Sequence, residues 1–352
     1  MPLKKIDDYP AYLEAAWREH LQSKPDNAPT VISTFAGCGG SSLGYSMAGF
    51  RELLAVEWDN NAVETFKLNF PDVPMYHGDI AKISVEEVLS MTGLKVGELD
   101  ILDGSPPCQG FSTAGKRQLD DPRNQLFREY VRLLRGLKPK VFVMENVSGM
   151  VKGIMKLVFV EILKELKASG YKVSARLLNA MYFNVPQSRQ RMIFIGVRDD
   201  LGIEPTHPEV ESKPVTVRQA IEDSPIGLSD GEFIGAKAQL ATQILRGGDG
   251  SDVIKGTSFN LKRLDWNKPS RCVLKSVGRP DSSYGGGLIH PDQNRHINIT
   301  ELKRISSYYD DYNFVGKFQE QWMRIGNSVP PLFMRSIANH IRNEILTPET
   351  LT

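Results

Sequence analysis

From Thr30 onward, short apolar runs alternate with segments whose apolar residues have helical spacing, and this alternation restricts the fold more than any other feature. Short apolar runs are typical of buried strands, and apolar residues repeating every three or four positions are typical of helices. Alternating strands and helices form parallel sheets covered by helices. The pattern therefore predicts an α/β fold with a doubly wound, mostly parallel sheet. Predicted strands are 31–35, 53–56, 99–102, 141–144 and 192–197, and predicted helices are 43–48, 61–69, 85–91, 127–137 and 156–169.

The alternation does not extend over the whole chain. Apolar residues at positions 13, 16, 17 and 21 predict an N-terminal helix packed on the main domain, and the regular periodicity ends near Gly202. A last helix is predicted after Pro331, because proline suits the first helical turn. We expect four parts: a helical extension at 1–29, a large domain at 30–203, a second, smaller domain at 204–320, and a segment at 321–352 that returns to the large domain.

Composition excludes several classes of protein. The longest apolar stretches are shorter than the roughly 20 residues that a membrane helix needs, and no apolar core follows the charged N-terminus, as it would in a signal peptide. The three cysteines, at 38, 108 and 272, are too scattered for a disulfide framework or a zinc site. We therefore expect a cytoplasmic protein that binds no metal and no membrane.

The net charge of +1 conceals a basic region. Between Phe233 and His290 the chain has nine Lys and Arg against four Asp and no Glu, a balance of +5, so the remainder carries −4. A basic, glycine-rich segment of this kind is typical of a surface that contacts a polyanion. Charge alone is equally compatible with an ordinary solvated surface.

Cys108 lies in an unusual frame, Asp103-Gly-Ser-Pro-Pro-Cys108-Gln-Gly-Phe-Ser112, directly after an apolar run. Structural cysteines usually lie inside apolar periodic segments, where a thiol behaves as a small hydrophobe. Two adjacent prolines instead fix the backbone and expose one thiol at the end of a predicted strand. We interpret Cys108 as a nucleophile, which needs a cationic or basic partner and an electrophile held nearby.

The first predicted strand leads into a glycine-rich loop and then a helix. Such a loop lets a ligand approach the backbone, and the start of the helix offers free N–H groups. Twenty residues after Gly37, Glu57 ends the second strand, where a carboxylate can bind a ribose diol. Trp58 could stack on an adenine, and Asp79 could bind its exocyclic amine. Together they predict a nucleoside cofactor. The loop residues are Phe35, Ala36, Gly37, Cys38, Gly39 and Gly40.

Two further segments carry charged side chains next to predicted strands. Glu145 ends the fourth strand and would share a crevice with Cys108 if both strands are central, where it could protonate a ring nitrogen. Gln187, Arg189 and Arg191 would point to one face of an extended segment. Two guanidiniums entering a buried strand are costly unless they meet anions or an oxygen-rich ligand, and a surface strand edge is the alternative.

Taken together, these segments closely resemble the cytosine-5 DNA methyltransferase family of the bacterial restriction-modification type. The resemblance extends from Thr30 to about Ile345, and six short motifs occur in the family's order. It implies the S-adenosylmethionine-dependent methyltransferase fold with a small target-recognition domain. The motifs are Phe35–Gly40, Glu57-Trp58 with Asp79, Pro107-Cys108-Gln109, Glu145-Asn146-Val147, Gln187-x-Arg189-x-Arg191 and Gly326-Asn-Ser-Val-Pro-Pro331.

The resemblance also implies roles for individual residues. The catalytic residues would be Cys108, Glu145, Arg189 and Arg191. S-adenosyl-L-methionine would be bound by the loop residues at 35–40 and by Glu57, Trp58, Asp79, Ile80, Pro107, Leu126, Asn327, Ser328 and Val329. DNA would be bound by Gln109, Ser112, Lys116, Arg117 and Gln187.

The implied reaction begins when the target cytosine leaves the duplex stack. Cys108 then adds to C6, Glu145 supports protonation at N3, and C5 accepts the methyl group. The implied partner is double-stranded DNA, bound by a monomer, with a cognate restriction endonuclease as a further candidate. The action would be cytoplasmic, on the bacterial nucleoid.

One motif departs from the family pattern, an Arg-x-Leu-Thr-x-Arg-Glu segment that organises the recognition domain. Here Arg295 and Glu301 remain, but Asn298 replaces the threonine and Thr300 replaces the second arginine. This puts in doubt how the small domain is braced.

Three other functions remain open at this stage. They are a cytosine-5 tRNA methyltransferase on the same scaffold, a catalytically silent DNA- or cofactor-binding module, and a nicotinamide oxidoreductase. Ser42 in place of a third glycine counts against the last.

Overall fold

The computed structural model describes residues 3–107, 125–151, 155–254, 261–279 and 286–347. Contacts divide the chain into two compact units. The unit that contains the large sheet, here called the sheet unit, comprises Glu19–Leu178, Gln190–Glu209 and Met334–Thr352. The other, here called the small unit, comprises Met1–Arg18, Asn179–Arg189 and Val210–Phe333. The four parts expected from the sequence have different bounds and stay a prediction.

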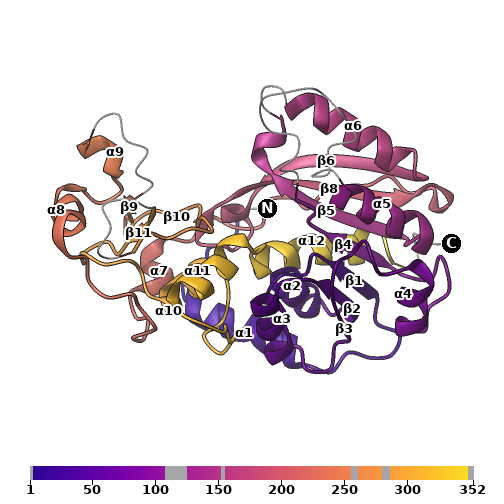
Figure 1. Ribbon diagram of the computed structural model, residues 1–352, viewed down its shortest axis with the longest axis horizontal. Helices are drawn as coiled ribbons and strands as arrows, with labels where there is room; N and C mark the ends of the chain where they lie inside the picture. Colours follow the sequence, from indigo (N-terminus) through magenta and orange to yellow (C-terminus); the bar gives the residue numbers. More distant parts are fainter. Residues whose placement is uncertain (1–2, 108–124, 152–154, 255–260, 280–285, 348–352) are drawn as a thin grey trace. The chain divides into compact units, whose positions relative to one another are not determined.

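The sheet has seven strands in the order β3-β2-β1-β4-β5-β8-β6 (Figure 1). Neighbouring strands from β3 to β5 are parallel, and β8 is antiparallel to β5. The predicted α/β fold with a doubly wound, mostly parallel sheet is therefore confirmed. The strands are β1 (Thr30–Thr34), β2 (Arg51–Glu57), β3 (Met75–His77), β4 (Ile101–Gly104), β5 (Val141–Val147), β6 (Tyr171–Asn179) and β8 (Gln190–Arg198).

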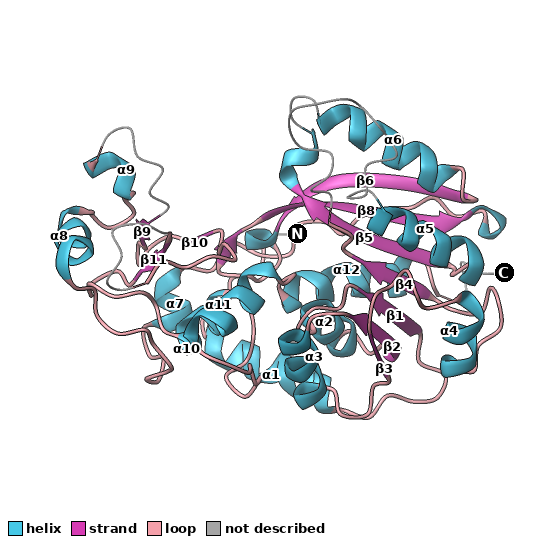
Figure 2. Ribbon diagram, in the orientation of Figure 1, coloured by secondary structure: helices cyan, strands magenta, loops and turns pink. Residues whose placement is uncertain are grey.

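Helices connect the strands of the sheet and pack on both of its faces (Figure 2). The connections from β1 to β2 and from β4 to β5 run in opposite directions across the sheet, so right-handed crossovers place their helices on opposite faces. The helices are α2 (Gly40–Met47), α3 (Asn60–Asn69), α4 (Val85–Thr92), α5 (Gln125–Leu137) and α6 (Met155–Lys167).

The main apolar core lies between the sheet and α4, α5 and α6. On α5, the hydroxyl of Tyr130 lies 3.3 Å from the carbonyl oxygens of both Leu102 on β4 and Val143 on β5. Asp59 caps α3 and Ser84 caps α4, each by accepting a backbone N–H of its helix's first turn. Packing is tight on β8, where a Cβ added to Gly196 would lie 1.9 Å from the Phe142 ring.

The small unit consists of short elements. Its strands form two parallel pairs, β7 (Gln187–Ser188) with β10 (Ser270–Arg271), and β9 (Leu261–Arg263) with β11 (Gly287–Ile289). Its helices are α7 (Val217–Ile221), α8 (Gly235–Gln243), α9 (Gly250–Val253), α10 (Ile299–Ile305) and α11 (Phe318–Asn327).

Two further helices and three short turns complete the description. The N-terminal helix α1 (Tyr9–Leu21) contacts the small unit through Trp17, whose ring centroid lies 5.9 Å from that of Tyr309. The last helix, α12 (Pro331–Glu344), runs from the small unit into the sheet unit. Single 3-10 turns occupy Ser148–Val151, Ala180–Tyr182 and Asp199–Leu201. Within the described ranges, no helix is long and apolar enough to cross a bilayer.

Candidate active site

The glycine-rich loop after β1 has a backbone that requires its glycines. Phe35, Gly37 and Gly39 have φ of 56°, 57° and 91°, in the left-handed region that favours glycine. The Ala36 N–H donates to the Val56 carbonyl at 3.1 Å, which holds the loop against the end of β2. Phe35 adopts this conformation without being glycine, a strain that persists only where the surroundings impose it.

Glu57 fixes both the loop and the end of its own strand. One carboxylate oxygen accepts the Gly37 N–H at 2.8 Å, and the other accepts the N–H groups of Trp58 and Asp59 at 2.9 and 3.0 Å. The residue is 8% exposed. Because each carboxylate oxygen can accept two hydrogen bonds, Glu57 retains capacity to bind a hydroxyl group.

A pocket of about 220 Å³ opens beside this loop. Its walls are mostly apolar, with the carboxylates of Glu57 and Asp79 and the Trp58 indole, which is 77% exposed. Apolar walls with a few polar groups suit a nucleoside. The lining residues predicted from the sequence are Phe35, Glu57, Trp58, Asp79, Ile80, Pro107 and Leu126.

The sequence interpretation missed two lining residues, Val56 and Gly78. Each directly precedes a predicted carboxylate, so extending the motifs by one residue would have found them. Three predicted cofactor residues, Asn327, Ser328 and Val329, lie instead in the small unit at the end of α11, where the Ser328 hydroxyl contacts that of Tyr308. Their part in the pocket stays a prediction.

An ion pair joins the ends of two neighbouring strands at the same edge of the sheet. Arg191 Nε lies 2.7 Å from Glu145 Oε1, and their side chains are only 13% and 11% exposed. Because β8 is antiparallel to β5, its first residues lie beside the last residues of β5. The guanidinium therefore orients the carboxylate, and its Nη1 donates to the Gln190 carbonyl at 2.8 Å.

The loop that leads to the predicted nucleophile is held at its start. The buried Asn146 side chain donates from Nδ2 to the carbonyl of Pro106 at 3.2 Å, and Pro107 lines the pocket. The predicted residues Cys108, Gln109, Ser112, Lys116 and Arg117 lie outside the described residues. The two other cysteines are placed: Cys38 is buried and Cys272 is half-buried.

A buried acid lies on β4 just before this loop, and the sequence interpretation gave it no role. Asp103 is 3% exposed, and its Oδ1 accepts a hydrogen bond from the Tyr45 hydroxyl at 3.1 Å. Burial raises the pKa of Asp103 to about 8, and the nearby charges of Glu52 and Glu145 add to the effect. Burial likewise raises the pKa of Glu52 to about 7, although parts of that residue reach solvent. At neutral pH, Asp103 is therefore mostly a neutral acid.

The arginine motif divides between the two units. Gln187 and Arg189, 1% and 3% exposed, make their hydrogen bonds within the small unit. Arg189 donates to the Val273 carbonyl at 3.0 Å and to the Gly326 carbonyl at 3.1 Å. Arg191 instead pairs with Glu145. The two arginines thus have different partners, whereas the extended pattern suggested one shared face.

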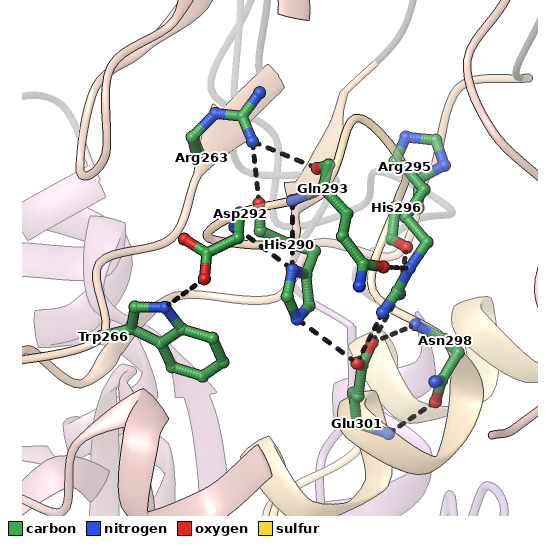
Figure 3. A network of polar contacts seen from close by, with 9 residues as sticks. All are labelled: Arg263, Trp266, His290, Asp292, Gln293, Arg295, His296, Asn298 and Glu301. Carbon is green, nitrogen blue, oxygen red and sulfur yellow. Dashed lines mark hydrogen bonds and ion pairs between the residues drawn. The ribbon is translucent and has the colours of Figure 1, made fainter. Parts of the chain in front are cut away.

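The segment from Arg295 to Glu301, which differs from the family pattern, still forms an internal network of hydrogen bonds (Figure 3). Arg295 makes two parallel hydrogen bonds of 2.8 Å to the carboxylate of Glu301. Asn298 is the N-cap of α10: its side chain accepts the Glu301 N–H at 2.9 Å, while Glu301 accepts the Asn298 N–H at 2.7 Å. Asparagine and threonine are both good N-caps, so the replacement at Asn298 preserves the local structure.

Arg263 connects several loops of the small unit by hydrogen bonds and also appears in Figure 3. It is 6% exposed, and its guanidinium donates to four main-chain carbonyls and to the Asn294 side chain. The carbonyls belong to Ala241, Ile244, His290 and Gln293.

Comparison with known proteins agrees with this geometry. The C-5 cytosine-specific DNA methylase family matches residues 29–343. The type II methyltransferase M1.HphI of Haemophilus parahaemolyticus is 37% identical over 89% of this chain and 86% of its own length. M.NgoFVII of Neisseria gonorrhoeae, also a type II methyltransferase, is 33% identical over 90% of this chain and 87% of its own.

Solved structures share the fold. An E. coli prophage protein described as a DNA modification methyltransferase has a TM-score of 0.71 at 25% identity and covers 91% of this chain and 100% of its own. Spodoptera frugiperda DNMT2, at 19% identity and a TM-score of 0.65 over 90% of this chain and 99% of its own, shows the fold alone. These findings favour the DNA enzyme over the alternatives left open by the sequence. The chain belongs to the C-5 cytosine-specific DNA methylase family and is a type II DNA (cytosine-5-)-methyltransferase.

Proposed function

We propose that Cys108, Glu145 and Arg191 methylate carbon 5 of cytosine through a covalent adduct on a base flipped out of duplex DNA. The observation that carries this proposal is the buried Glu145–Arg191 ion pair at the sheet edge. The loop to Cys108 starts at that same edge, tied to β5 by Asn146. A carboxylate oriented by a guanidinium beside the start of a proline-fixed thiol loop can share a proton with a ring nitrogen next to a nucleophile.

Each residue has one step in this mechanism. The Cys108 thiolate adds to C6, while Glu145 holds a proton at N3, so that electron density moves to C5. C5 would take the methyl group that bound S-adenosylmethionine supplies, leaving a neutral thioether, and its own proton would pass to a solvent base. The N3 proton would return to Glu145 as the C6–S bond breaks and releases the thiolate. Arg191 keeps the Glu145 carboxylate aimed at the ring and stabilises charge that develops on the base.

The family uses S-adenosylmethionine, which supplies an electrophilic methyl group when bound. The residues of the pocket fit this molecule, because Glu57 and Asp79 can accept from its ribose hydroxyls and amine while the exposed Trp58 ring can stack on adenine. We assign cofactor contacts also to the loop at 35–40 and to Asn327, Ser328 and Val329.

The same proposal covers the DNA. Gln109, Ser112, Lys116 and Arg117 would contact the duplex near the flipped base, and the small unit would recognise the target sequence. The enzyme would act as a monomer in the bacterial cytoplasm, with a restriction endonuclease of the same specificity as its genetic partner.

The test is a covalent trap. Duplex DNA with 5-fluorocytosine at the target cannot lose the C5 substituent, so the wild-type enzyme should remain attached to it. Cys108→Ser should give no adduct and abolish methylation, because a serine hydroxyl is far less ionised than a thiol at neutral pH. Activity of the serine variant within about tenfold of wild type would refute the covalent mechanism. Faster methylation of tRNA than of duplex DNA would refute the substrate.

A further inference from the structure

We propose that the exposed residues Leu274, Lys275 and Ser276 contact the target duplex, and that Gln187, Arg189 and Trp322 are positioning residues that hold them there. This inference rests on the proposed function, because it takes duplex DNA as the substrate. It assigns Arg189 to sequence recognition rather than to the base pocket.

Hydrogen bonds from distant parts of the small unit fix the backbone just before these residues. Val273 is bound on both sides: its N–H donates to Gln187 Oε1 at 3.0 Å, and its carbonyl accepts from Arg189 at 3.0 Å. The next carbonyl, of Leu274, accepts from the Trp322 indole at 2.9 Å. These three side chains are buried, so their hydrogen bonds are shielded from water.

Gly326 on α11 adds a further constraint, because the backbone of Leu274 and Lys275 passes directly against it. A Cβ at Gly326 would lie 2.5 Å from the Leu274 carbonyl oxygen and 3.0 Å from the Lys275 Cα. Arg189 also donates to the Gly326 carbonyl at 3.1 Å, so one guanidinium ties α11 to the segment. A glycine in the motif Gly326-Asn327-Ser328-Val329 thus has a role in the small unit.

The far end of the segment is fixed as well. The Gly278 N–H donates to the Gly286 carbonyl at 2.8 Å. The buried ammonium of Lys237 donates to the carbonyls of Gly278 and Arg279 at 3.2 and 2.8 Å. The stretch 274–277 is therefore held at both ends.

Between these anchors, the side chains point to solvent. Val273 is 1% exposed, whereas Leu274 is 47% exposed, and Lys275 and Ser276 are also exposed. A fixed backbone that presents an apolar, a cationic and a hydroxyl side chain has already lost its conformational entropy, which lowers the cost of binding. Aliphatic and hydroxyl groups can contact base edges, and a lysine can contact phosphate or guanine.

The distribution of cations in the small unit points to the same segment. Of the nine Lys and Arg between Phe233 and His290, Lys237 and Arg263 are buried and bonded to carbonyls. Three others form ion pairs with aspartates: Arg246 with Asp292, Lys262 with Asp249, and Lys268 with Asp265. Of the remaining four, Lys255 lies outside the described residues, and Arg271, Lys275 and Arg279 are exposed and pair with no carboxylate of the described part of the chain. The excess positive charge of the region is therefore concentrated at 271–279.

The first experiment measures phosphate contact. Lys275→Ala and the control Lys268→Ala both remove one exposed lysine, but Lys268 is already paired with Asp265 at 3.4 Å. DNA affinity is measured over a range of salt concentrations. We expect Lys275→Ala to lower the slope of log K against log salt by about one, and Lys268→Ala to leave it unchanged. Equal slopes for Lys275→Ala and wild type would refute a phosphate contact at Lys275. An equal decrease of the slope in Lys275→Ala and Lys268→Ala would mean that any exposed lysine of the small unit has this effect, and would refute the assignment of DNA contact to residues 274–276.

The second experiment separates recognition from chemistry. Arg189→Lys keeps the charge but loses the planar fork that reaches two carbonyls at once. Methylation is compared at the recognised sequence, identified by bisulfite sequencing, and at sequences that differ by one base. Arg189→Lys should reduce this discrimination about tenfold and raise KM for DNA, with kcat and S-adenosylmethionine affinity near wild type.

Arg191→Lys is the matched variant and should show the opposite result, a lowered kcat with discrimination intact. If Arg189→Lys behaves like Arg191→Lys, Arg189 belongs to the base pocket and the inference is wrong. If the wild-type enzyme methylates no duplex DNA, the proposed function has failed instead. Wild-type methylation with unaltered discrimination in both Arg189→Lys and Lys275→Ala would overturn the inference alone.

Discussion

Replacing Asp103 with asparagine should change how the stability of the protein depends on pH. Asp103 lies on β4, 3% exposed, and burial raises its pKa to about 8. An acid whose pKa is higher in the folded state binds its proton more tightly there than in the unfolded chain. Its contribution to stability is fully present below the unfolded pKa of about 4 and is lost as the pH rises toward 8. Asparagine has no proton to lose, and its amide oxygen can still accept from Tyr45.

The magnitude follows from the linkage relation. Between pH 5 and pH 8 an isolated group of this kind would lose about 1.4 kcal/mol per pH unit, about 4 kcal/mol in all. Glu52, with a pKa raised to about 7, titrates in the same range and its charge adds to the cost of ionising Asp103. The Glu52 charge is part of what raises the pKa of Asp103, and Glu52 keeps its own raised pKa in the variant. We therefore expect Asp103→Asn to lose about 4 kcal/mol less stability than wild type over this interval.

Urea unfolding at pH 5, 6, 7 and 8 measures this difference. Other groups contribute in this range because they titrate there in the unfolded chain, such as His20 and His207, whose pKa values in the folded protein burial lowers to about 4. They are common to both proteins and cancel in the comparison. Asp72→Asn, at an exposed site, is the control and should run parallel to wild type. A parallel curve for Asp103→Asn would mean that Asp103 is ionised in the folded protein, which would refute the reasoning.

Substitutions at three further sites test other parts of the structure. Glu57→Ala should weaken S-adenosylmethionine binding by about 1.5 to 3 kcal/mol, the scale of hydrogen bonds to a charged group, and unchanged affinity in calorimetry would contradict its role. Asn298→Ala should lower the free energy of unfolding by about 1 kcal/mol through loss of the α10 cap, whereas Asn298→Thr should cost only a few tenths; equal losses in denaturant titrations would argue against the cap. Gly196→Ala should destabilise by about 1 to 3 kcal/mol, because its Cβ meets the Phe142 ring, and an unshifted melting temperature would show that the ring can move aside.

Most of the sheet could be predicted from the sequence because its central strands are buried on both faces. All five predicted strands are present, since a strand such as β5 begins with a continuous, buried apolar run at 141–144. The missed strands have no such run. Met75–His77 is short and partly exposed, and Tyr171–Asn179 is an edge strand whose residues are mostly half-buried or exposed.

The site could be predicted only where the chemistry is local in the chain. Glu57 was found because its distance from Gly37 reflects one strand-helix-strand unit, and the structure joins the two by a hydrogen bond of 2.8 Å. Arg189 shows the limit of this reasoning. Its partners Val273 and Gly326 are 84 and 137 residues away, so no spacing rule could separate it from Arg191. Asp103 could not be recognised as a neutral acid because burial is a property of the fold.

The guanidinium of Arg263 has a consequence for how this enzyme could evolve. It holds the loops around Ile244 and His290 chiefly by their main-chain carbonyls. A bond to a carbonyl is indifferent to the side chain of the residue that supplies it, so these loops can exchange residues without losing their anchor. Selection for a new DNA target and selection for a folded unit then act on different positions. A library randomised at the exposed loop positions should therefore remain largely folded, whereas the same library built on Arg263→Leu should not.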